Sequence, residues 1–131
     1  MASTTFSGPV TSTNGFIGAL TGNVTGNVTG NMSGVVTATN QALSGAGAVN
    51  TTTMLTSVTS TGSAQALTLA DGAIGQVKII VHTVDGGSAV LTPTTKIGFS
   101  TITFTAVGDS AALIYTATGW AIFGSRGVTI A

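Results

Sequence analysis

Residues 18–37 read GALTGNVTGNVTGNMSGVVT, which is five consecutive units of glycine, any residue, an apolar residue and Thr or Ser. A period of four fits a helical turn. However, each glycine costs about 1 kcal/mol relative to alanine in a helix, and Val, Thr and Asn are weak helix formers. Four is also twice the period of a strand. The repeat therefore predicts one extended strand over residues 18–37.

The two faces of such a strand differ in chemistry, because glycine alternates with apolar side chains on one face and the other face is almost entirely polar. Ordering this backbone costs about 20–40 kcal/mol, and five buried apolar side chains return only about 1.5–3 kcal/mol each. No other segment matches the repeat, so the simplest partner is another copy of it. The alternative is a flexible glycine-rich linker.

We therefore expect an intertwined, preferentially three-stranded shaft. Its oligomer core would consist of the apolar residues Leu20, Val24, Val28, Met32 and Val36. Its backbones would approach closely at the glycines between them, Gly18, Gly22, Gly26, Gly30 and Gly34.

The charge content of the chain restricts its function. The 131 residues include three Lys or Arg, three Asp or Glu, one His and no Cys. Catalytic sites usually gather several ionisable groups, so we expect no enzyme, no metal site and no cofactor. Three scattered cations argue against nucleic acid binding, and no 18-residue apolar run predicts a membrane span. A neutral surface gives little repulsion between copies, which favours association.

The segments next to the repeat are less regular. Residues 1–17 are predicted to form an arm that becomes ordered on contact with a partner, and a frayed terminus is the alternative. This stretch lacks the basic and apolar regions of a signal peptide, which predicts synthesis in a cytoplasm. Residues 38–63 are rich in Ala, Thr and Ser. They are predicted to be a connector with one weak strand over 50–60.

Residues 64–131 alternate apolar and polar side chains between turn signals such as Asp71-Gly72 and Gly108-Asp109. This pattern predicts an all-β head domain, a small antiparallel sandwich or barrel that gains stability from packing between subunits. The predicted strands are 64–70, 74–84, 88–93, 100–107, 110–117, 119–124 and 126–131.

Few side chains are candidates for a site. His82 lies in an apolar strand without a second metal ligand nearby in sequence, which favours a structural role. Asp71, Asp85 and Asp109 stand beside glycines, where Asp is favoured for local hydrogen bonding in turns. Tyr115 and Trp120 flank the Thr118-Gly119 turn. They are expected to pack across a hairpin, and an exposed glycan-binding platform is the alternative.

Three stretches resemble small virion proteins of tailed bacteriophages. They are Thr4–Val10 followed by Thr13–Phe16, the TGNVTGNVTG run, and the hairpin of Ala112–Tyr115 with Gly119–Phe123. The resemblance implies a homotrimer on the virion surface that docks on the major capsid protein or another virion protein. The short shaft favours a capsid decoration protein, of the cement or head-fibre type, over a tail fibre.

In that picture the arm would dock on the capsid through Phe6, Pro9, Val10, Phe16 and Ile17. Two other interpretations stay open. One is a phage adhesin that binds host surface glycans through Tyr115 and Trp120. The other is a self-assembling fibre or matrix protein unrelated to a virus.

Overall fold

Ten strands and no helix make up the part of the chain that the structure, a computed structural model, describes, namely residues 33–131. The all-β prediction is confirmed for these residues. The expected arm and most of the expected shaft, residues 1–32, lie outside the described residues. Of the predicted shaft core only Val36 is described. It precedes the first strand and is exposed.

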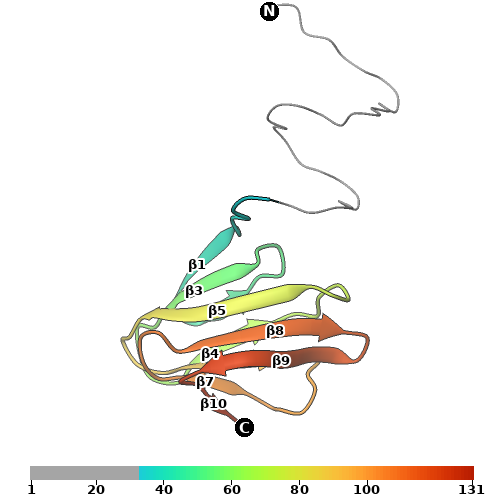
Figure 1. Ribbon diagram of the computed structural model, residues 1–131. Helices are drawn as coiled ribbons and strands as arrows, with labels where there is room; N and C mark the ends of the chain where they lie inside the picture. Colours follow the sequence, from blue (N-terminus) through green and yellow to red (C-terminus); the bar gives the residue numbers. More distant parts are fainter. Residues whose placement is uncertain (1–32) are drawn as a thin grey trace, which may run out of the picture. The chain divides into compact units, whose positions relative to one another are not determined.

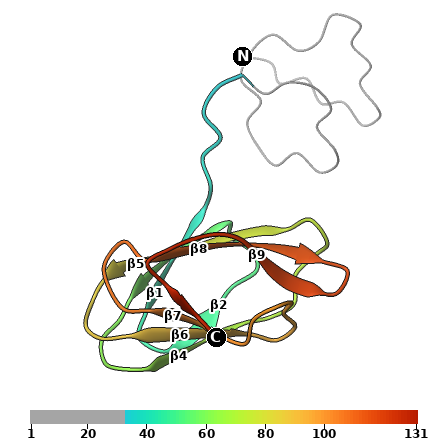
Figure 2. The ribbon, with the colours of Figure 1, turned by 60° about the horizontal axis from the view of Figure 1, so that its bottom comes forward.

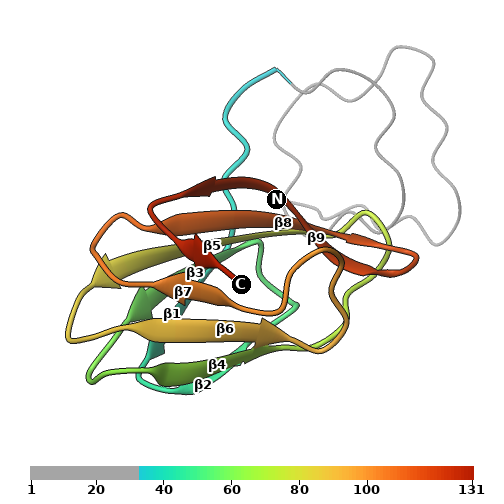
Figure 3. The same cartoon turned by 90° about the horizontal axis from the view of Figure 1, so that it is seen from below.

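The strands form two five-stranded sheets, which we call sheet A and sheet B (Figures 1 and 3). Sheet A has the order β1 (Asn40–Ser44), β3 (Leu55–Thr59), β5 (Val77–Val84), β8 (Ser110–Thr116) and β9 (Gly119–Arg126). Sheet B has the order β10 (Thr129–Ile130), β7 (Ile102–Phe104), β6 (Ala89–Pro93), β4 (Gln65–Leu69) and β2 (Gly47–Val49).

Both sheets are mixed, which corrects the predicted antiparallel architecture. From β1 to β6 every connection crosses to the other sheet, so the chain re-enters a sheet running in its earlier direction. As a result β1, β3 and β5 pair in parallel in sheet A, and β2, β4 and β6 do so in sheet B. Only β7 to β10 add antiparallel pairs. Each sheet keeps two edge strands, so the structure is not a closed barrel.

Residues 40–59 form β1, β2 and β3, so the predicted connector is instead part of both sheets. The Gln41 side chain ties β1 to β2, because its Nε2 donates to the carbonyl oxygen of Ala48 and its Oε1 accepts from the N–H of Asn50. Val49 and Val58 point into the core and are almost fully buried. These short strands are stable because their pairing closes over that core.

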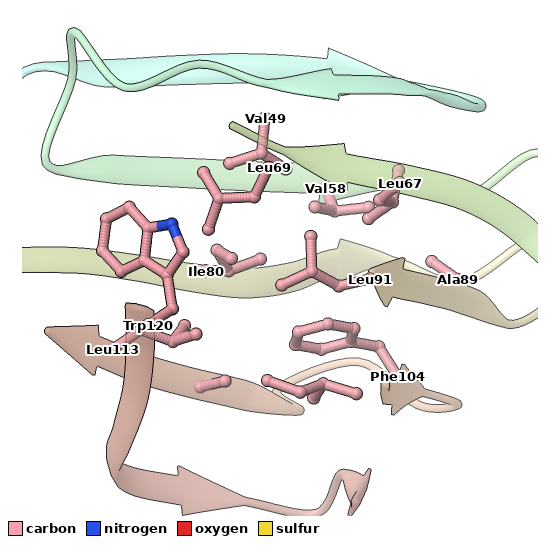
Figure 4. Close-up of a cluster of buried hydrophobic side chains, with 12 residues drawn as sticks. Val49, Val58, Leu67, Leu69, Ile80, Ala89, Leu91, Phe104, Leu113 and Trp120 are labelled. Atoms are coloured by element: carbon pink, nitrogen blue, oxygen red, sulfur yellow. The ribbon is translucent and has the colours of Figure 1, made fainter. Parts of the chain in front are cut away.

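The core lies between the sheets and is built from alternate residues of nearly every strand (Figures 2 and 4). It contains Val49, Val58, Leu67, Leu69, Ile80, Ala89, Leu91, Ile102, Phe104, Ala111, Leu113 and Trp120. All seven strands predicted in 64–131 are present, as β4 to β10. The predictions for β7 and β10 are too long, because only three and two residues there pair with neighbours.

Candidate functional site

One pair in the described residues has the geometry of a nucleophile and its base. Nε2 of His82 lies 2.8 Å from Oγ of Ser60, and Nδ1 lies 3.1 Å from the carbonyl oxygen of Ala106. A carbonyl can only accept, so Nδ1 carries the proton and donates. In the neutral imidazole, Nε2 then accepts from the Ser60 hydroxyl.

This pair is enclosed in the protein. His82 is 0% exposed and Ser60 is 2% exposed, so no substrate reaches either side chain. Oγ of Ser60 also accepts from the N–H of Gly86 at 2.9 Å, which links β3 to the turn after β5. The arrangement satisfies buried polar groups and joins three segments. The structural interpretation of His82 is therefore the one that its contacts support.

Asp109 closes the loop between β7 and β8 near this pair. Its Oδ2 accepts from the backbone N–H groups of Thr105 and Ala106, at 2.8 and 2.9 Å. The Thr105 N–H is the main cause that lowers the pKa of Asp109, and burial opposes it. The carboxylate therefore stays ionised and holds a turn, as predicted for Asp beside glycine.

The other two aspartates also bind backbone or hydroxyl groups. Asp85 accepts from the N–H of Gly87 within its own turn. Asp71 accepts from the N–H and the hydroxyl of Thr95 and so ties two loops together. No group of three or more His, Cys, Asp or Glu side chains that could hold a metal ion occurs within residues 33–131.

Lys78 is a buried cation that sequence reasoning missed. Its side chain points into the sandwich from β5 and is fully buried. Nζ donates to the carbonyl oxygen and the hydroxyl of Thr53 at 2.8 and 3.1 Å. Burial lowers the pKa of Lys78 to about 8. The sequence feature that could have revealed it is the alternation in the strand VKIIVHTV, which places Lys78 and His82 on the same face as Ile80.

Tyr115 and Trp120 face each other across the β8–β9 hairpin, with ring centroids 5.1 Å apart and planes at 72°. The predicted hairpin packing is thus present. Trp120 is 0% exposed, and its Nε1 donates to the carbonyl oxygen of Ala70 at 2.9 Å. The alternative of a glycan platform is wrong for Trp120, because sugar stacking needs an open ring face. Figure 4 shows this ring within the buried cluster.

The described part of the chain has no pocket between its side chains. It also has no helix that is long and apolar enough to cross a membrane. Comparison of the chain with known protein families and with curated proteins finds no match.

Proposed function

We propose that this protein is a structural, self-associating virion component, a homotrimeric capsid decoration protein of a tailed bacteriophage. The observation that carries the proposal is the period-four repeat over residues 18–37. Its glycine and apolar face needs other strands to cover it, and the chain contains no second segment of the same pattern. The resemblance of Thr4–Val10 and of the closing hairpin to phage virion proteins supplies the biological setting.

The described residues support a structural role in a second way. Their nucleophile–base pair, Ser60 and His82, and their buried lysine, Lys78, are all enclosed in the sandwich. Each satisfies hydrogen bonds that hold strands and turns together. These groups stabilise a subunit, and they do not face a space where a substrate could bind.

In the proposed mechanism, the repeats of three copies wrap into a shaft, and the arm of each copy docks on the shell. The two-sheet domain of each copy then forms a rigid head. Extra buried area and strand pairing oppose separation of capsid subunits when the packaged genome presses outward. The work of the protein is mechanical, because it adds interface to a shell that must stay closed.

Two measurements test this proposal on the full chain. Light scattering coupled to size exclusion should give three times the chain mass, and a single-copy mass over the whole concentration range would overturn it. The purified protein should also bind capsids of its phage after their DNA has been released, and should not bind host cells. Binding to cells alone would replace decoration with adhesion.

A further inference from the structure

Strand β5 turns two polar side chains toward the core and three apolar side chains outward. Its buried residues are Lys78, Ile80 and His82, so two of its three core positions carry polar side chains. Val77, Ile79 and Val81 alternate with them and point away from sheet B, where they are part-exposed. A strand at a solvated face normally shows the reverse arrangement, with apolar residues inside and polar residues outside.

The neighbours of β5 extend this apolar surface across sheet A. The strand register places Leu55, Ile79 and Ala112 side by side, and it places Val77 beside Ile114 and Ala121. All of these residues are part-exposed. We call this surface, the side of sheet A turned away from sheet B in Figures 2 and 3, the outer face of sheet A. It consists of Leu55, Ser57, Val77, Ile79, Val81, Ser110, Ala112, Ile114 and Ala121.

The corresponding face of sheet B has the ordinary character of a solvated surface. There the register aligns Thr68 with Thr92, and Val90 with Thr103 and Thr129. Hydroxyl groups therefore alternate with the buried Leu67, Leu69, Leu91 and Phe104. Two faces of one small protein thus differ in a way that strand propensity alone does not explain, since threonine and valine both favour strands.

No charged side chain lies at the centre of the outer face of sheet A. Of the charged residues, all of which are described, Lys78 and Asp109 are buried, and Asp71, Asp85 and Lys96 lie in loops. Arg126 ends β9 opposite Ser110, at a corner of the face. A surface with an apolar centre and polar groups at its rim has the composition of a protein–protein interface.

We propose that copies of this chain pack against one another through the outer face of sheet A. This inference rests on the self-association in the proposed function, and it adds a second contact surface outside the repeat. A second copy suits the face because the chain is neutral and the face is uncharged at its centre. Two such faces can meet without burying an unpaired charge.

The size of the face shows why it would act together with the repeat. The residues of the face come from four strands, which lie about 4.8 Å apart, and about five residues of each at about 3.3 Å cover roughly 320 Å². A stable interface buries about 800 Å² on each partner. The face alone therefore supports only weak association. Copies already joined elsewhere have effective concentrations in the millimolar range, at which a weak contact forms.

Cysteine reactivity tests the proposal cleanly, because the chain has no cysteine of its own. Ser57→Cys places a thiol on the outer face of sheet A, and Thr103→Cys places one at a similarly part-exposed position on sheet B. In the assembled full chain, maleimide should modify the Ser57→Cys thiol at least tenfold more slowly than the Thr103→Cys thiol. A short bis-maleimide should join two copies through the Ser57→Cys thiol only.

A charge on the face supplies the second variant. Ile79→Glu in the Ser57→Cys protein should remove the protection and the cross-link, whereas Val90→Glu on sheet B should leave both unchanged. Circular dichroism checks that each variant is folded. A fast reaction of the Ser57→Cys thiol in an oligomer of confirmed mass would overturn the inference while leaving the proposed function standing.

Protection that persists at a single-copy mass, without a cross-link between copies, would also overturn it, because another part of the same chain would then cover the face. A single-copy mass with an unprotected thiol would refute both the inference and the proposed function. The mass measurement therefore separates failure of the inference from failure of the proposed function.

Discussion

Nζ of Lys78 on β5 lies 2.8 Å from the carbonyl oxygen of Thr53, which belongs to the loop between β2 and β3. The ammonium group thus donates to a backbone carbonyl and a hydroxyl, and no carboxylate of the described residues accepts from it. Removal from water disfavours the charged form, so burial lowers the pKa of Lys78 to about 8.

This pKa predicts that the protein becomes more stable as the pH rises from about 8 towards 10. The folded-state pKa is below the unfolded value of 10.5, so the unfolded chain binds more protons in this window. Unfolding therefore costs more as pH increases, by about 1–3 kcal/mol in total. Urea unfolding followed by circular dichroism at a series of pH values measures the effect.

Two variants serve as controls for this pH dependence. Lys78→Met should flatten the rise, and Lys96→Met, which removes the same charge at a part-exposed loop position, should keep it. Burial and the nearby Asp71 carboxylate raise the pKa of Tyr115. The contribution of Tyr115 to the free energy of unfolding therefore falls above about pH 10, because the tyrosine of the unfolded chain ionises first. A rise that survives Lys78→Met would show that another group causes it.

Replacement of the buried Trp120 should cost more stability than replacement of the exposed Phe123 on the same strand. Trp120→Ala empties a fully buried site and leaves the carbonyl of Ala70 without its donor. We expect a loss of about 3–5 kcal/mol in the free energy of unfolding. Phe123→Ala, at a residue on β9 that is 60% exposed, should cost less than about 1 kcal/mol. Equal losses in urea unfolding would contradict the burial of Trp120.

Gly87 is required where two backbones approach closely. A Cβ built on Gly87 would lie 2.5 Å from the carbonyl carbon and oxygen of Gly62, and φ there is +137°. Gly75 also has a positive φ, +86°, but open space surrounds it. Gly75→Ala should cost about 1–2 kcal/mol from conformation alone. Gly87→Ala should cost about 1–3 kcal/mol more, because the backbone must move.

Thermal unfolding of the two glycine variants compares a crowded position with an open one. Both substitutions add the same methyl group at a positive φ and carry a conformational penalty, and Gly87→Ala adds the collision with the Gly62 backbone. If Gly87→Ala unfolds at the same temperature as Gly75→Ala, the turn after β5 does not pack against the loop after β3.

Substitutions in the repeat test the proposed shaft directly. Val24→Asp or Val28→Asp should abolish oligomerisation, because charges from three copies would meet unpaired near a common axis. Thr25→Asp, on the predicted polar face, should have a much smaller effect on assembly. Light scattering gives the mass of each variant, and an unchanged oligomer for Val24→Asp and Val28→Asp would refute the shaft.

The sequence by itself determined the all-β class and the positions of the strands from Gln65 onward. Alternation with a period of two, broken by turn residues such as Asp71-Gly72, is a local signal. It can be recognised without knowing which strands pair with one another. The pairing of Tyr115 with Trp120 was also predictable, because a two-residue turn joins the strands that carry them. The aspartates in turns follow from the same local chemistry.

Only the tertiary structure decided how the strands pair and which side of each faces the core. Strand direction depends on whether a connection stays in one sheet or crosses to the other, and residue types do not encode that choice locally. Of the strands over residues 40–59, only β3 was predicted, as a weak strand over 50–60. β1 and β2 have no strong local pattern and form because they pair at the edges of the two sheets. In β5, apolar side chains lie on both faces, so only packing against sheet B shows that Lys78 and His82 point inward and Ile79 outward.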